Sequence, residues 1–204
     1  MNLRSLFLLL AAVTALALPS CVSSSVSLDY QPRPGQMMRG NPEFTVGAFH
    51  NGRKEPPYYL GTVRTPIGTP VENVQTRTPI EQIVGNAFAH ALDARGMLAT
   101  GGREKFILTG DVLDLYCQQI VHPYGYARIR VNVIHAASGG LVFSRIYVGE
   151  RQSAAYMPGS GSPIPLLREL TSRALQDAVD NALDDREMRA RLRGSAPRYT
   201  PGML

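Results

Sequence analysis

Two stretches of the chain carry apolar residues at helical spacing. In the first, which we predict to run from about Pro79 to Arg95, one stripe comprises Ile80, Ile83, Val84, Ala87, Phe88, Ala91 and Leu92. Thr78 is placed as the N-cap, Pro79 as the first helical residue and Glu81 as the partner in a capping box. Gly96 follows as the residue that ends the helix. A helix with one apolar face is expected to lie on a sheet.

The second helix is predicted from about Pro163 to Leu183, with Ser162 as its N-cap. Its stripe is formed by Leu167, Leu170, Ala174, Ala178 and Ala182, with Leu175 and Val179 alongside. Asp184 and Asp185 then begin a short helix over residues 186–192.

Between the two helices, residues 106–120, 127–136 and 141–151 are predicted to be successive strands. In the middle strand Ala127, Ile129, Val131 and Val133 alternate with Arg128, Arg130 and Asn132, which is typical of a half-buried antiparallel strand. Ser138-Gly139-Gly140 predicts a tight hairpin turn. Two shorter strands, 44–49 and 58–64, precede the first helix.

This order of elements predicts an α+β fold. We expect a two-layer sandwich in which two amphipathic helices cover one face of an antiparallel sheet, as a single domain over residues 43–193. The other face of the sheet is left to solvent or to a partner.

The first 20 residues have the pattern of a secretory signal peptide. Arg4 supplies the positive charge, residues 6–18 form the apolar core, and the run is too short and too sharply ended for a membrane span. Leu18-Pro19-Ser20-Cys21 resembles the lipobox of bacterial lipoproteins. That resemblance implies that the Cys21 sulfur carries a diacylglycerol, that residues 1–20 are removed, and that the new N-terminus is acylated. The alternative is an ordinary signal peptide with an incidental cysteine.

Residues 21–42 are predicted to be the lipidated cysteine and a flexible tether, because serines, prolines and glycines interrupt any periodicity. Residues 194–204 are predicted to be a disordered tail. Within the lipoprotein resemblance, Val22 stands where an aspartate often signals retention in the inner membrane. We therefore expect a lipid anchor on the periplasmic face of the outer membrane.

Charge and composition exclude few functions. Loss of Arg4 with the signal peptide lowers the net charge from +5 to +4, an excess typical of a solvated surface. Nucleic acid is not expected as a partner of an exported chain without a recognition motif. Lipidation of Cys21 leaves Cys117 without an intramolecular partner, and its apolar strand pattern predicts a small core residue.

Candidate catalytic groups do not converge. His90 and Asp93 lie three residues apart on the first helix, where a solvent-facing hydrogen bond is favoured over a metal site. Asp111 and Asp114 would point to opposite faces of a regular strand, and could pair only across a bulge. Residues 159–161, Gly-Ser-Gly, lack the spacing of a nucleophile elbow. We expect no enzymatic activity, no catalytic residues, no cofactor and no metal.

Two surface groups are candidates for binding. Arg186, Arg189, Arg191 and Arg193 form the densest basic cluster, which is either a solvated face or a contact to headgroups or a partner. Tyr124 and Tyr126 flank Gly125 at a strand connection and could anchor a protein interface, although packing or turn stabilisation is the commoner role.

The chain resembles the YajG-like lipoproteins and, more loosely, the auxiliary lipoproteins of ABC-type transport systems. The resemblance rests on the lipobox, on Ala91-Leu92-Asp93-Ala94-Arg95-Gly96, on residues 127–133 with the glycine hairpin, and on the late helix leading into Asp184-Asp185. It implies a non-catalytic envelope lipoprotein that docks to an envelope protein. The alternative is a lipid-handling lipoprotein, which an apolar cleft lined by Ile83, Phe88, Val131 and Leu170 would favour.

Overall fold

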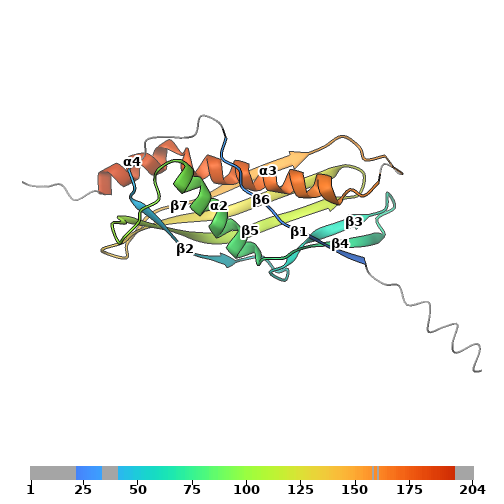
Figure 1. Cartoon of the computed structure of the whole chain (residues 1–204), viewed down its shortest axis with the longest axis horizontal. Helices are drawn as coiled ribbons and strands as arrows, with labels where there is room; N and C mark the ends of the chain where they lie inside the picture. The colour runs from blue at the N-terminus through green and yellow to red at the C-terminus, as the bar shows by residue number, and fades with distance from the viewer. Residues whose placement is uncertain (1–21, 34–40, 158, 160, 196–204) are drawn as a thin grey trace, which may run out of the picture.

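The computed structural model describes residues 22–33, 41–157, 159 and 161–195 (Figure 1). The elements in chain order are β1 Val22–Val26, β2 Phe44–Asn51, β3 Tyr59–Arg64, β4 Pro70–Thr76, α2 Ile80–Ala94, β5 Phe106–Gln119, β6 Pro123–His135, β7 Leu141–Gln152, α3 Ile164–Leu183 and α4 Arg186–Ser195. The signal peptide and Cys21 lie outside the described residues.

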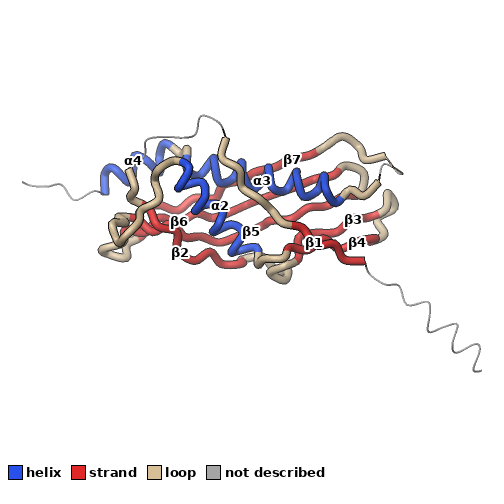
Figure 2. The backbone as a smooth tube through the Cα atoms, viewed as in Figure 1, coloured by secondary structure: helices blue, strands red, loops and turns tan. Residues whose placement is uncertain are grey.

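The predicted α+β two-layer fold is confirmed. The helices α2 and α3 lie side by side on one face of a seven-stranded sheet (Figures 1 and 2). The strand order is β1-β4-β3-β5-β6-β7, with β2 also paired to β5. The predicted antiparallel meander of β5, β6 and β7 is present, but the sheet as a whole is mixed, because β1–β4, β2–β5 and β3–β5 are parallel pairs.

Helix α2 ends where the sequence predicts, but it begins without the predicted cap. Gly96 has a positive φ of 65° and closes the helix, with the amide of Met97 donating to the Leu92 carbonyl at 2.8 Å. At the other end Pro79, not Thr78, is the N-cap residue and no side chain caps the helix. The amide of Ile80 is instead satisfied by the carbonyl of Pro57 at 3.0 Å. The preceding loop therefore replaces the predicted capping box.

Helix α3 packs closely on the sheet because β7 carries a glycine beneath it. A Cβ atom on Gly149 would lie 1.9 Å from the carbonyl oxygen of Ala174, so only glycine permits this approach. Small residues on the helix side, among them Ala174 and Ala178, are fully buried against the strands. The sequence thus sets the distance between the two layers through small residues on both sides.

The prediction of a flexible tether is wrong for residues 22–33. Val22–Val26 forms β1, an edge strand paired in parallel with β4. Val26, Leu28 and Tyr30 are buried, at every second position, so the segment continues in extended form across the helical layer. The three consecutive serines that precede this alternation have the composition of a linker. Residues 34–40 of the predicted tether lie outside the described part of the chain.

The C-terminal helix is longer than predicted. Asp185 caps α4, because its Oδ1 accepts from the amides of Glu187 at 2.7 Å and Met188 at 3.2 Å. The helix continues through Ser195, so the predicted tail does not start at residue 194. Met188 is fully buried and joins α4 to the core.

Candidate binding surface on the sheet

The helices leave one face of the sheet uncovered, which we call the open face. On β6 the predicted alternation holds, since Ile129 and Val131 are fully buried under the helices. Arg128 and Arg130 point to the open face, with 45% and 44% of their side chains exposed. On β7, Ile146 and Val148 are exposed and pair with Arg130 and Arg128 in the register. Arginines therefore lie beside aliphatic side chains there.

Three tyrosines cluster at one end of the open face. The ring centroids of Tyr116 and Tyr126 are 5.4 Å apart, and the Tyr124 ring lies 6.0 Å from the former and 6.2 Å from the latter. Burial raises the pKa of Tyr124, and the neighbouring Tyr116 and Glu150 raise it further. The raised pKa values of Tyr116 and Tyr124 keep their hydroxyls neutral at physiological pH, so these two residues offer aromatic area together with uncharged hydrogen-bonding groups.

Asp111 and Asp114 lie on the same face of β5, contrary to the expectation for a regular strand. The pairing of β5 with β6 shifts between Val112 and Asp114, and this bulge returns Asp114 to the open face. Asp114 Oδ2 is 2.5 Å from Arg128 Nε, and Asp111 Oδ2 is 3.3 Å from Arg130 Nη1. Each carboxylate has its own arginine across the strand, which is an arrangement of surface ion pairs rather than of a shared proton.

Arg53 fills a gap between two strands on the same edge of β5. β2 pairs with β5 as far as Val112, whereas β3 pairs with it only from Cys117 onward. Arg53 Nη1 donates to the carbonyls of Leu115 at 2.7 Å and Tyr59 at 3.0 Å, replacing the missing strand contacts. Burial lowers the pKa of this guanidinium, but it remains charged. A pocket of about 280 Å³ opens beside the gap.

On the opposite side of the sheet, a buried ion pair holds the N-terminal segment against the helices. Arg95 Nη2 at the end of α2 lies 2.9 Å from Asp180 Oδ1 on α3. The Tyr30 hydroxyl donates to the same Oδ1 at 2.7 Å and accepts from Arg95 Nη1 at 3.1 Å. Burial raises the pKa of Tyr30 to about 12. Arg33 Nε adds a second pair to Asp180, at 3.2 Å.

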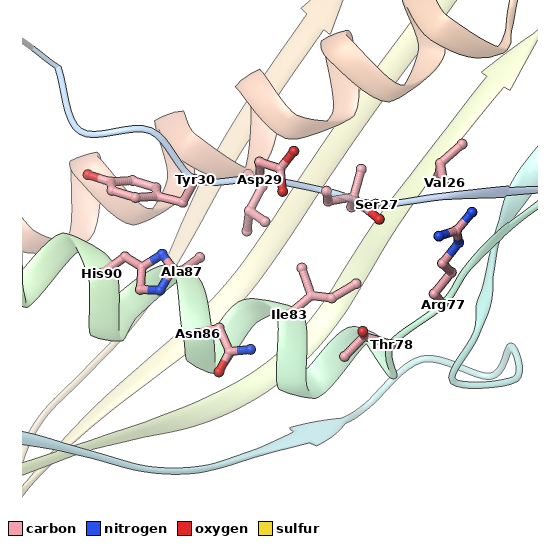
Figure 3. A pocket seen from close by; sticks show the side chains of 12 residues that line it. Val26, Ser27, Asp29, Tyr30, Arg77, Thr78, Ile83, Asn86, Ala87 and His90 are labelled. Carbon is pink, nitrogen blue, oxygen red and sulfur yellow. The ribbon is translucent and has the colours of Figure 1, made fainter.

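A small pocket of about 260 Å³ lies between this segment and α2 (Figure 3). Ile83 lines it, as do polar side chains such as Asn86 and His90 (Figure 3). This volume is below the range of about 300–1,000 Å³ typical of drug-sized ligand sites. Phe88 and Val131, two of the four residues proposed to line a lipid cleft, are instead fully buried in the hydrophobic core. The cleft that these four residues were proposed to line is therefore filled at Phe88 and Val131, which does not favour lipid handling at this place.

The remaining candidate residues from the sequence lie in surroundings that do not form a reactive or metal-binding site. Cys117 is fully buried and burial raises its pKa to about 12, which confirms a core residue. His90 and Asp93 are both exposed on α2. Within the described residues, no group of three or more His, Cys, Asp or Glu side chains could hold a metal ion. Arg189 belongs to the basic cluster, and its Nη2 donates to the Leu183 carbonyl at 2.9 Å, so part of that cluster stabilises the end of α3.

The open face, the strand gap and the buried ion pair each join residues far apart in sequence, and sequence reasoning missed how they come together. One local signal was available. Buried positions on β5 fall at even numbers up to Val112 and at odd numbers from Leu115 onward, and this change of phase marks the bulge.

Comparisons with known proteins define the fold and no more. No family model matches the sequence, and a search of curated proteins finds no match. Among solved structures, a protein from Xanthomonas campestris described as DUF330 is similar at a TM-score of 0.58 and 13% identity, covering 86% of this chain and 100% of that chain. An uncharacterized protein is similar at 0.50 and 12% identity, covering 80% and 97%.

A lipoprotein from Neisseria meningitidis is a more distant match, at a TM-score of 0.30 and 11% identity, covering 70% of this chain and 98% of that chain. No described helix is long and apolar enough to cross a membrane. The YajG-like resemblance stays a prediction, and the chain shares the fold of the DUF330 protein.

Proposed function

We propose that the protein is a non-catalytic lipoprotein, anchored through lipid on Cys21 to the periplasmic face of the outer membrane, that binds another envelope protein through the open face. The lipobox pattern at residues 18–21 supports the anchor. The open face carries the binding role, because it combines the tyrosine cluster with exposed Ile146 and Val148. Tyrosine and arginine are enriched at protein–protein interfaces, and the two aliphatic side chains add apolar area beside them.

The arginines of the open face indicate what kind of surface a partner would present. Arg128 and Arg130 are paired with carboxylates within the face, so they offer planar donors without a large net charge. We expect a partner that contributes an apolar and aromatic surface with a few acceptors, rather than a strongly acidic one.

The anchor is tested by mass spectrometry of the N-terminal peptide of the native protein. Lipidation predicts a peptide that begins at Cys21 and carries a diacylglycerol and a further acyl chain. The Cys21→Ala variant should lose this mass and leave the membrane fraction. A native peptide that begins elsewhere, or an unmodified Cys21, would contradict the anchor.

The binding face is tested with a photo-crosslinking amino acid placed at Val148 in intact cells. Only Lys54 and Lys105 are lysines, so amine crosslinkers would sample little of the surface. Arg173, whose side chain is 63% exposed on α3, is the matched control on the helical side. A discrete crosslinked protein from Val148 and not from Arg173 supports the proposal. The same products from both positions, or from neither, would refute a partner on the open face.

A further inference from the structure

The strand register brings four segments together at one end of the molecule, which we call the apolar end. Val63 pairs with Gln119, so β3 and β5 finish at the same end and are followed by the turns 65–69 and 120–122. Tyr124 pairs with Gln152, so the chain after β7, from Ser153 to Met157, starts at this end as well. Val22 pairs with Glu72 just after the 65–69 turn, so β1 also starts at this end (Figure 1).

The segments of the apolar end have an unusual composition. The two turns and the loop, residues 65–69, 120–122 and 153–162, contain no Asp, Glu, Lys or Arg, although 18% of the whole chain is charged. Surface loops of this kind ordinarily carry charge.

Large apolar side chains are exposed from each of these segments. Ile67 is 90% exposed at the tip of the β3–β4 turn, and Met157 is 73% exposed in the loop before α3. Val121 is 46% exposed between β5 and β6, and the amide of Tyr156 donates to its carbonyl at 3.0 Å, which joins the two loops. Val71 adds a further exposed side chain beside the start of β1. Together they form an apolar rim across the width of the sheet, bordered by charged residues such as Arg64, whose Nη1 donates to the Gly68 carbonyl at 3.1 Å.

The opposite end of the sheet is more charged, although the hairpin 136–140 is uncharged there and Leu141 is 64% exposed. The segment before β5 contains Arg103, Glu104 and Lys105, and Lys105 pairs with Glu43 across the start of β2. The apolar end thus differs from the opposite end in the charge of its loops, and it is the end at which the chain leaves Cys21.

From this placement we propose that the apolar end lies against the phospholipid bilayer, with Ile67, Val121 and Met157 inserted among the headgroups. The inference rests on the proposed lipid anchor. Val22 already belongs to β1, so one Cα–Cα step of about 3.8 Å separates the first paired residue from the acylated cysteine. Without a tether, the acyl chains hold this end at the membrane, and the sheet projects from it with its open face available to a partner.

The absence of tryptophan from the sequence makes a direct test possible. Ile67→Trp, Val121→Trp and, as the control at the opposite end, Leu141→Trp each introduce a single tryptophan at an exposed apolar position. The full lipidated protein is reconstituted into phosphatidylcholine vesicles whose acyl chains are brominated or unbrominated. Flotation of the vesicles first establishes that the lipoprotein is anchored.

Insertion predicts that bromine removes about half of the fluorescence of the Ile67→Trp and Val121→Trp proteins, because interfacial side chains reach roughly 5–10 Å into the boundary with the acyl chains. The Leu141→Trp protein should be unaffected. Two results would overturn the proposed orientation without contradicting the anchor. In the first, the protein floats with the vesicles but neither Ile67→Trp nor Val121→Trp is quenched. In the second, the protein floats and Leu141→Trp is quenched. Protein that does not float would overturn the lipid anchor itself.

Discussion

Replacing Asp180 by alanine removes the counter-ion of a guanidinium buried between α2 and α3. The side chains of Arg95 and Asp180 are 3% and 5% exposed, and Arg95 cannot lose its charge. Its remaining carboxylate neighbour, Asp184, lies 3.6 Å away and is half exposed. We therefore expect the full cost of an uncompensated buried charge, about 3–5 kcal/mol of unfolding free energy.

Two further variants divide this cost into its parts. Tyr30→Phe removes the hydroxyl that donates to Asp180 and accepts from Arg95, and should cost about 1.5–3 kcal/mol. Arg95→Met combined with Asp180→Leu removes both charges and should cost less than Asp180→Ala alone. Glu169→Ala is the control, because it breaks the exposed pair with Arg173 and should cost at most about 0.5 kcal/mol.

The assay is urea unfolding of the unlipidated Cys21→Ser form, followed by far-UV circular dichroism. Hydrogen exchange of residues 22–30 in the Tyr30→Phe protein reports in addition whether the N-terminal segment is released. A cost for Asp180→Ala no larger than that for Glu169→Ala would refute the reasoning. A double variant that costs as much as Asp180→Ala, or more, would do the same.

Three further predictions follow from the packing and the titrating groups. Gly149→Ala should cost about 1–3 kcal/mol in urea unfolding because α3 must move away from β7, whereas Gly194→Ala in the exposed last turn of α4 should be neutral or stabilising. Burial acts to raise the pKa of Asp185, but hydrogen bonds from Tyr147 and two amides hold it below its usual range. The Asp185 carboxylate therefore stabilises the fold at pH values above its unfolded pKa of about 3.9. At neutral pH, thermal unfolding should show that Asp185→Ala costs about 1 kcal/mol of unfolding free energy. This cost should vanish as the pH falls through the folded pKa of Asp185. The Cys117 thiol should react with a disulfide reagent only after unfolding, and rapid labelling of the native protein would contradict its burial.

The helices and the central strands were predictable because each carries a periodic signal within one local window. The α2 stripe, the Gly96 termination and the alternation along β6 required no knowledge of distant residues. Parallel pairing was not predictable in this way. β2 and β3 both pair with the same edge of β5. The contacts that stabilise this arrangement come from residues far apart in the sequence, among them Arg53, which donates to the Leu115 carbonyl between the two paired stretches.

The N-terminal segment shows why composition predicted a flexible tether where the chain forms a strand. Three serines after Val22 are typical of a linker, yet β1 pairs with β4 through its backbone, and the Ser24 hydroxyl also donates to the Glu72 carboxylate on β4. Tyr30 is then fixed by a carboxylate 150 residues away. The alternation of Val26, Leu28 and Tyr30 was a local signal of an extended buried segment, but the linker-like composition around it led to the prediction of a tether.

The measurement that tests the central claim most directly is photo-crosslinking from Val148 in intact cells, comparing the native protein with Cys21→Ala. Lipid anchoring together with an open binding face predicts one discrete envelope partner in the native protein and its loss in the unlipidated form, because the anchor places the face where the partner is. Identical crosslinks from both forms, or none from the native protein, would contradict the account.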